Sequence, residues 1–84
     1  MLQNFVYKTV SENHMIKSSS KSEVLISYGM PIAKVTSKGK VTLSPDWRKS
    51  KTVSKYRNAF LGEKTHKTLS ELRKGHYKIR TLAS

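Results

Sequence analysis

The side chains best suited to chemistry in this sequence are cations crowded into one short stretch. Five of the six candidate contact residues are basic, and the sixth carries the only indole ring of the chain: Trp47, Arg48, Lys49, Lys51, Lys55 and Arg57. Guanidinium and ammonium groups neutralise phosphate, and an indole ring can stack on a base. Ser50, Thr52 and Ser54 alternate with the cations and would add hydroxyl donors. The stretch therefore predicts a site for a polyanion.

These residues also have a purely structural interpretation. Trp47 follows the turn-forming pair Pro45 and Asp46, and a lone tryptophan in so small a chain is usually needed for packing. Basic side chains on a short helix commonly form only a solvated face. We expect the Trp47 ring to pack at the edge of the core. The role of the cations stays open between a binding site and a solvated face.

The sequence lacks the residue groupings that most enzymes need. The five acids are scattered, and His14, His66 and His76 have no metal-ligand spacing. No phosphate-cradling glycine loop is present, and without cysteine there is neither a thiolate metal site nor a disulfide. We expect a protein that is not an enzyme and uses no cofactor or metal, with its histidines at the surface or in turns.

Positive charge dominates the composition. The 84 residues contain 17 Lys and Arg against five acids, a net charge of +12, and residues 44–84 hold 11 of these cations and three of the acids. Such a field raises encounter rates with nucleic acid, an acidic protein surface or anionic lipid. It does not choose among them, and a Lys-rich surface can also serve solubility alone.

Length and hydrophobic content predict one small basic domain over residues 1–84. A hydrophobic share of 36% supports a single thin core. The sequence shows neither the pattern of a signal peptide nor a run of about 20 apolar residues. We therefore expect a soluble, cytoplasmic protein that does not contact membranes.

The cations fall on a predicted helix between residues 49 and 63. Four residues repeat at the spacing of an apolar helical stripe: Val53, Tyr56, Ala59 and Phe60. Ser50 or Thr52 can cap the start, and Gly62 can end the helix in the left-handed conformation. We predict a helix over residues 52–61. Three side chains should point to solvent, with Arg57 on the flank: Lys51, Lys55 and Asn58.

Most of the remaining chain predicts strands. β-Branched and aromatic residues favour strands in five segments: residues 3–10, 14–17, 23–28, 30–36 and 40–43. Residues 18–22 are expected to be a mobile loop, Pro31 must lie at a strand start, bulge or edge, and Gly39 fits a hairpin turn. The predicted fold is α+β, a small antiparallel β-meander of three to five strands covered by one or two C-terminal helices.

A second short helix is expected to begin between Thr65 and Thr68. Thr68 and Glu71 have capping-box spacing, and Gly75 follows two basic residues as a stop signal. Residues 77–82 alternate in polarity, so they are expected either to extend along the sheet edge or to fray.

Two motifs resemble a known family. Ser27-Tyr28 followed by Pro31-Ile32-Ala33 matches an S-Y-x-x-P-[IV]-A strand, and residues 50–62 match an S-x-T-T-S-K-Y-x-N-x-F-L-G helix, with Val53 in place of its second Thr. This combination resembles small bacteriophage-encoded proteins of a family of unknown function, over roughly residues 23–82. The resemblance implies phage origin and the order of strands before helix. It implies no activity.

Binding to nucleic acid through the basic C-terminal half is the favoured function, mostly by phosphate contacts and with little sequence specificity. The rival is a host-takeover or anti-defence factor that grips an acidic or nucleic-acid-binding host protein, including one whose nucleic-acid channel it blocks. An RNA-recognition sheet would need exposed aromatics, and Tyr7 and Tyr28, the best candidates, are as easily buried.

Overall fold

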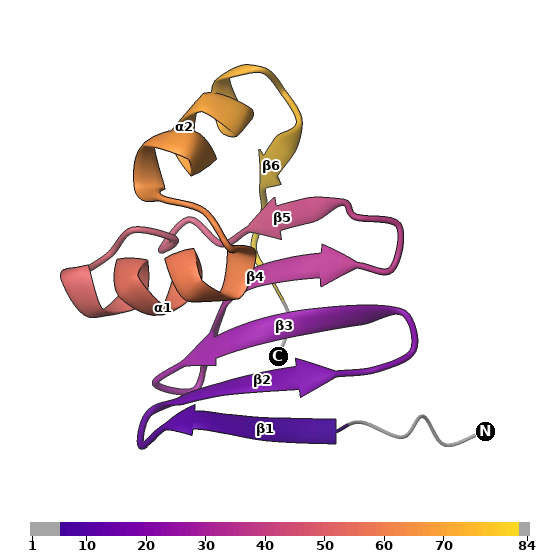
Figure 1. Ribbon diagram of the computed structural model, residues 1–84, viewed down its shortest axis with the longest axis vertical. Coiled ribbons are helices and arrows are strands. Elements are labelled where there is room, and N and C mark those ends of the chain that lie inside the picture. The colour runs from indigo at the N-terminus through magenta and orange to yellow at the C-terminus, as the bar shows by residue number, and fades with distance from the viewer. Residues whose placement is uncertain (1–5, 83–84) are drawn as a thin grey trace.

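The protein folds as one six-stranded sheet with two helices, and the computed structural model describes residues 6–82 (Figure 1). The elements in chain order are β1 (Val6–Ser11), β2 (His14–Ser18), β3 (Ser22–Ser27), β4 (Met30–Thr36), β5 (Val41–Leu43), α1 (Lys51–Leu61), α2 (Thr65–Arg73) and β6 (Tyr77–Ile79). The strands stand in the sheet in their sequence order. Neither helix within residues 6–82 is long and apolar enough to cross a membrane.

The predicted α+β meander is confirmed and extended by one strand. β1 to β5 pair antiparallel with their neighbours, and β6 adds to the β5 edge in parallel, with Tyr77 opposite Val41. The Arg80 N–H donates to the Leu43 carbonyl at 2.9 Å, so of the two outcomes expected for residues 77–82, extension along the sheet edge is the one found for residues 77–80. Residues 3–5 of the predicted first strand lie outside the described residues.

The loop between β2 and β3 is shorter than predicted. Ser18 still pairs with Glu23, and Ser22 pairs with Thr36, so within this loop only residues 19–21 have no strand partner. Ser19 tightens this turn, because its N–H donates to the Ser22 carbonyl at 2.9 Å and its hydroxyl accepts from the Ser22 N–H at 3.3 Å. The run of serines is a closed hairpin turn.

Pro31 lies beside a bulge in β4, one of the positions expected for it. Leu25 pairs with Ala33 and Ile26 with Pro31, so Ile32 has no partner in β3. A bulge bends the strand and re-aims the extra residue. Ile32 points into the core, where it is 2% exposed.

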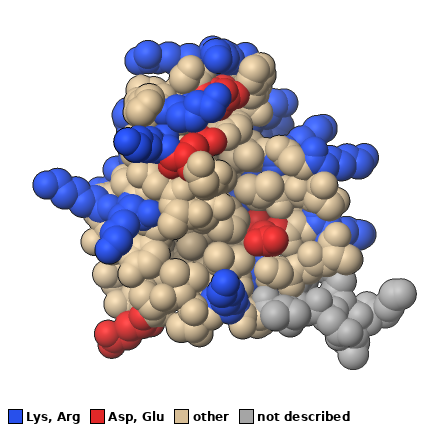
Figure 2. Space-filling model, in the orientation of Figure 1, with Lys and Arg blue, Asp and Glu red and all other residues tan. Residues whose placement is uncertain are grey.

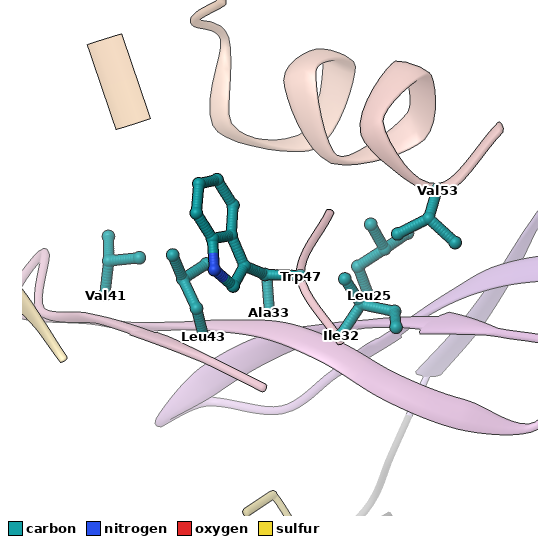
Figure 3. Packing of buried hydrophobic residues seen from close by; sticks show 7 residues of the cluster. All are labelled: Leu25, Ile32, Ala33, Val41, Leu43, Trp47 and Val53. Atoms are coloured by element: carbon teal, nitrogen blue, oxygen red, sulfur yellow. The ribbon is translucent and has the colours of Figure 1, made fainter. Parts of the chain in front are cut away.

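The core lies between the sheet and α1 (Figure 3). Seven apolar side chains form it: Leu25, Ile32, Ala33, Val41, Leu43, Trp47 and Val53. Ser50 caps α1 by accepting the Val53 N–H at 3.2 Å, and Gly62 ends the helix with a φ of 69°. Both end signals were therefore predicted correctly.

The predicted orientation of α1 is correct in outline. Tyr56 and Phe60 pack half-buried against the core while Lys55 is exposed. Ala59, expected on the apolar side, is exposed instead, because the helix leans on the sheet through the side that carries Val53 and Arg57.

α2 begins at Thr65, within the predicted range, but the capping-box interpretation of Thr68 is wrong. Thr68 is inside the helix and fully buried, and its hydroxyl donates to Glu63 at 2.7 Å. The end of α2 is as expected: Gly75 has a φ of 80°, and the His76 N–H donates to the Glu71 carbonyl at 3.0 Å. This is the hydrogen bond of a Schellman cap.

Candidate functional site

A hollow of about 680 Å³ lies beside the first turns of α1 and is called the helix hollow below. Three cations and four neutral polar side chains line it: Arg48, Ser50, Lys51, Ser54, Lys55, Asn58 and Thr65. The three cations are exposed. Figure 2 shows Lys and Arg side chains projecting from the end of the molecule where α1 begins.

Helical spacing brings the cations together. Lys51 and Lys55 are four residues apart and so lie on one face of α1, where like charges repel unless an anion separates them. Arg48 reaches the same hollow from the turn before the helix. Its guanidinium lies 5.0 Å from the centre of the Trp47 ring, a cation–π distance that helps to hold the side chain in place.

Arg57 does not lie on the helix flank, as the sequence suggested, but is fully buried. It donates to the Trp47 carbonyl at 2.5 Å, to Asn58 Oδ1 at 2.8 Å and to Thr65 Oγ1 at 2.6 Å, and its Nε has no partner. A signal for this was present, because residue 57 follows Val53 by one helical turn and shares its face. Arg57 is therefore not a surface contact.

The buried guanidinium adds positive charge behind the helix hollow. Burial lowers the pKa of Arg57, and the positive charge of Arg48 lowers it further, whereas the negative charge of Glu63 raises it. The side chain stays charged, because arginine is not deprotonated in proteins. Every hydrogen-bond acceptor that it uses within residues 6–82 is neutral. Three of its neighbours line the hollow: Ser54, Asn58 and Thr65.

Trp47 is also unavailable as a base-stacking platform. It is 4% exposed and belongs to the core, and the Arg57 guanidinium lies 4.8 Å from the ring centre. The packing interpretation is therefore correct, and the ring lies inside the core rather than at its edge. Lys49 is exposed but does not line the hollow, and neither does Thr52.

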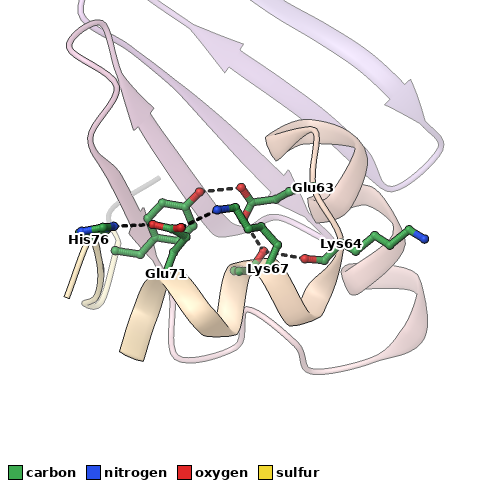
Figure 4. Close-up of polar contacts among 7 residues, drawn as sticks. Glu63, Lys64, Lys67, Glu71 and His76 are labelled. Carbon is green, nitrogen blue, oxygen red and sulfur yellow. Dashed lines mark hydrogen bonds and ion pairs between the residues drawn. The ribbon is translucent and has the colours of Figure 1, made fainter. Parts of the chain in front are cut away.

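The acidic side chains near the helices make their hydrogen bonds and ion pairs with residues outside the hollow (Figure 4). Glu71 pairs with Lys67 at 2.7 Å and with His76 at 2.6 Å, and these contacts lower its pKa to about 2. Glu63 accepts from Thr68 and Tyr77, each at 2.7 Å. Within residues 6–82 the two contacts of Glu71 are the only ion pairs, so the cations of the helix hollow have no ion pair there.

His14 is buried rather than at the surface or in a turn. Its ring nitrogens contact Ser11 at 2.9 Å and Ser27 at 2.8 Å, and the ring stacks on Tyr56 at 3.9 Å. Burial lowers its pKa. His66 and His76 are exposed as expected, and no cluster in the described part of the chain could hold a metal ion.

The chain matches a family of unknown function (DUF8033) over residues 2–76 and therefore belongs to that family. No curated protein matches it significantly, and no solved structure does either.

Proposed function

We propose that this domain binds nucleic acid through the phosphate groups, at the helix hollow. The observation that carries the proposal is a hollow with three exposed cations that have no carboxylate partner within residues 6–82. Leaving such charges unpaired costs stability, because Lys51 and Lys55 repel each other on one helix face. A bound phosphate relieves that repulsion.

Neutral donors and the helix itself support the same ligand. The hydroxyls of Ser50, Ser54 and Thr65 lie around the cations, as they do at many phosphate contacts. The N-terminal end of α1 carries partial positive charge, and the Arg57 guanidinium lies behind the wall. None of these groups reads a base edge, so the binding should have little sequence specificity.

The test is the affinity of the protein for a fluorescent DNA duplex, measured by anisotropy from about 50 mM salt upward. Changing Arg48, Lys51 and Lys55 to Glu should abolish binding. In the wild type, the slope of log affinity against log salt should be steep, at about 0.9 for each phosphate neutralised. A matched variant changes three exposed cations outside the hollow to Glu: Lys8, Lys21 and Lys38.

Both triple variants alter net charge equally, so they compare position alone. The control should weaken binding only through the overall field. Equal losses in the two variants would mean that no site exists at the hollow, and a wild-type protein that fails to bind duplex at low salt would overturn the proposal.

A second candidate is a phage-type accessory factor that binds a host protein in the cytoplasm. It is favoured by the exposed apolar side chains at the β3–β4 turn, Tyr28 at 62% and Met30 at 40% exposure. Exposed aromatic and Met side chains are enriched at protein interfaces. A pull-down from nuclease-treated host lysate separates the candidates, because only a protein partner persists and is lost when Tyr28 and Met30 are changed together.

A further inference from the structure

A second hollow, of about 400 Å³, lies beside the last turn of α1 and is called the serine hollow below. Two hairpin turns at the same end of the sheet border it, residues 19–21 between β2 and β3 and residues 37–40 between β4 and β5 (Figure 1). The Ser37 N–H donates to the Lys21 carbonyl at 2.8 Å and so holds the two turns together. Five hydroxyls line the hollow: Ser19, Ser20, Ser22, Thr36 and Ser37.

The remaining lining residues place the serine hollow on the sheet face that α1 covers. They are Glu23, Val35 and Phe60, and the last two pack half-buried against the core. Glu23 is paired with Val35 across β3 and β4, so both side chains point to the same face. The segment after β6 passes behind the sheet in Figure 1, on the face away from α1, and therefore does not cover the hollow.

Several polar groups in the serine hollow have no partner in the protein. The hydroxyls of Ser19 and Thr36 hold their own turns, because each accepts a backbone N–H. Within residues 6–82 no hydrogen bond is made by the other three hydroxyls, those of Ser20, Ser22 and Ser37. Glu23 is exposed and makes neither a hydrogen bond nor an ion pair there. Three groups that both donate and accept, and one that only accepts, are thus available to a ligand.

The lining selects a neutral ligand rather than an ion. No Lys or Arg lines the serine hollow in the described part of the chain, and the Glu23 carboxylate repels phosphate. The net charge of +12 disfavours a small cation. The volume is that of a small-molecule site. A sugar fits these conditions, because its hydroxyls pair with hydroxyls and a carboxylate while its C–H faces pack on the apolar wall of Val35 and Phe60.

We propose that the serine hollow binds a neutral sugar through one pyranose ring. One face of the ring lies on Phe60, and two neighbouring sugar hydroxyls donate to the Glu23 carboxylate, which can accept both. Ser20, Ser22 and Ser37 hydrogen-bond to the remaining sugar hydroxyls from the two turns. The proposal is independent of the function proposed for the helix hollow, because the two hollows share no lining residue and the ligand is uncharged.

The experiment titrates the full chain, labelled with ¹⁵N, with neutral methyl pyranosides and follows the backbone amides by NMR. The probes are the methyl glycosides of glucose, galactose, mannose and N-acetylglucosamine. At least one should give saturating shifts, largest at residues 19–23 and 35–37. Inorganic phosphate and methylammonium test the two ionic alternatives and should give no saturating shift at these amides. Binding of either ion at the hollow in place of the pyranosides would overturn the proposal.

Glu23→Gln tests the carboxylate, because it keeps the shape of the side chain and removes its charge. It should weaken binding of the best pyranoside about tenfold, since hydrogen bonds to a charged acceptor are about twice as strong as neutral ones. Glu12→Gln is the matched control: it changes net charge equally, and Glu12 is exposed outside the hollow. The amide spectra establish that both variants are folded. Equal affinity in the two variants overturns the proposal, as does the absence of saturating shifts with all four pyranosides.

Discussion

The helix hollow and the serine hollow both lie beside α1 and are both lined by hydroxyls, yet their charges are opposite. The helix hollow takes its cations from eight consecutive residues around a helix start and has a buried guanidinium behind its wall. The serine hollow takes its lining from two hairpins and one helix residue, and its one charged side chain in the described part of the chain is Glu23. The first suits phosphate, whereas the second suits a neutral ligand that donates hydrogen bonds.

The difference shows that net charge alone does not define a binding surface. Both hollows belong to a chain of net charge +12, but only the helix hollow is lined by cations, and the serine hollow has a carboxylate and an aromatic ring instead. Hydroxyls serve in both, because they donate to phosphate and to sugar oxygens alike. The two hollows should therefore bind different ligands, an anion and a neutral sugar.

The largest effect should come from Arg57, which supports the helix hollow and not the serine hollow. Arg57→Ala removes the donor for the Trp47 carbonyl, Asn58 and Thr65 and leaves these acceptors unpaired. Leaving a buried acceptor unsatisfied costs about 1–3 kcal/mol, so the loss of several acceptors' donor should be a large fraction of the stability of a small domain. Urea denaturation followed by circular dichroism measures the free energy of unfolding.

Lys55→Ala is the control for this prediction and should change stability by less than about 0.5 kcal/mol, because Lys55 is exposed. Arg57→Lys keeps the charge but cannot form the same fork of hydrogen bonds. It should fold with reduced stability and lose duplex affinity more than pyranoside affinity. An Arg57→Ala protein as stable as the wild type would show that the guanidinium does not support the hollow.

The next effect is a crossover between the two ligands. Reversing Arg48, Lys51 and Lys55 to Glu should weaken duplex binding at least about tenfold more than Glu23→Gln does, and the order should invert for the pyranoside. Anisotropy titrations with duplex and NMR titrations with the pyranoside measure this for both variants. If one variant is the weaker for both ligands, the protein has a single binding surface.

The sequence predicted the helix hollow far better than the serine hollow, because the helix hollow is local. Ser50, Lys51 and Lys55 are joined by helical spacing, which a periodic pattern reveals directly. Thr65 was missed, since it returns to the hollow only after the chain turns at Gly62. Trp47 and Arg57 were misplaced as contacts because side-chain type suggests solvent or ligand, whereas packing against the sheet decides burial.

The serine hollow was invisible at the sequence level for a different reason. Its lining comes from residues 19–23, residues 35–37 and Phe60, so only the strand register and the position of α1 bring it together. The bulge at Ile32 moves that register by one position between β3 and β4. The β-branched residues predicted where the strands are. They could not predict the faces, because a one-residue shift in strand register moves every side chain of the strand to the other face of the sheet.

A smaller effect should come from mild acid, which acts on the helix-covered face through His14. Burial lowers the pKa of His14, so the unfolded chain takes up a proton at a higher pH than the folded protein does. Stability is therefore full above the unfolded pKa near 6.5 and falls as the pH drops below it, by at most about 1.4 kcal/mol per pH unit. Urea midpoints at several pH values between 7.5 and 5.5 measure the loss.

His14→Gln should flatten this pH dependence, because it removes the group that titrates. His66→Gln is the matched control, since His66 is exposed, and it should keep the wild-type slope. Within residues 6–82 no histidine lines the helix hollow or the serine hollow, so the loss belongs to neither hollow. An unchanged slope in His14→Gln would assign the acid sensitivity to another group.

The smallest effect tests whether the β3–β4 turn belongs to either surface. Tyr28 has a φ of 51° and Gly29 a φ of 76°, the positive values of a type I′ turn, in which Asn is favoured over tyrosine. Tyr28→Asn should therefore stabilise the protein by about 0.5–1 kcal/mol, reduced by the loss of the edge contact with the His14 ring at 5.4 Å. Thermal melting measures the gain.

Binding to duplex and to the pyranoside should stay unchanged, because Tyr28 lines neither the helix hollow nor the serine hollow. A stabilised variant that loses affinity for either ligand would mean that a strained, exposed tyrosine is kept at this turn for contact with a partner, and the boundary of that surface would then have to include the turn.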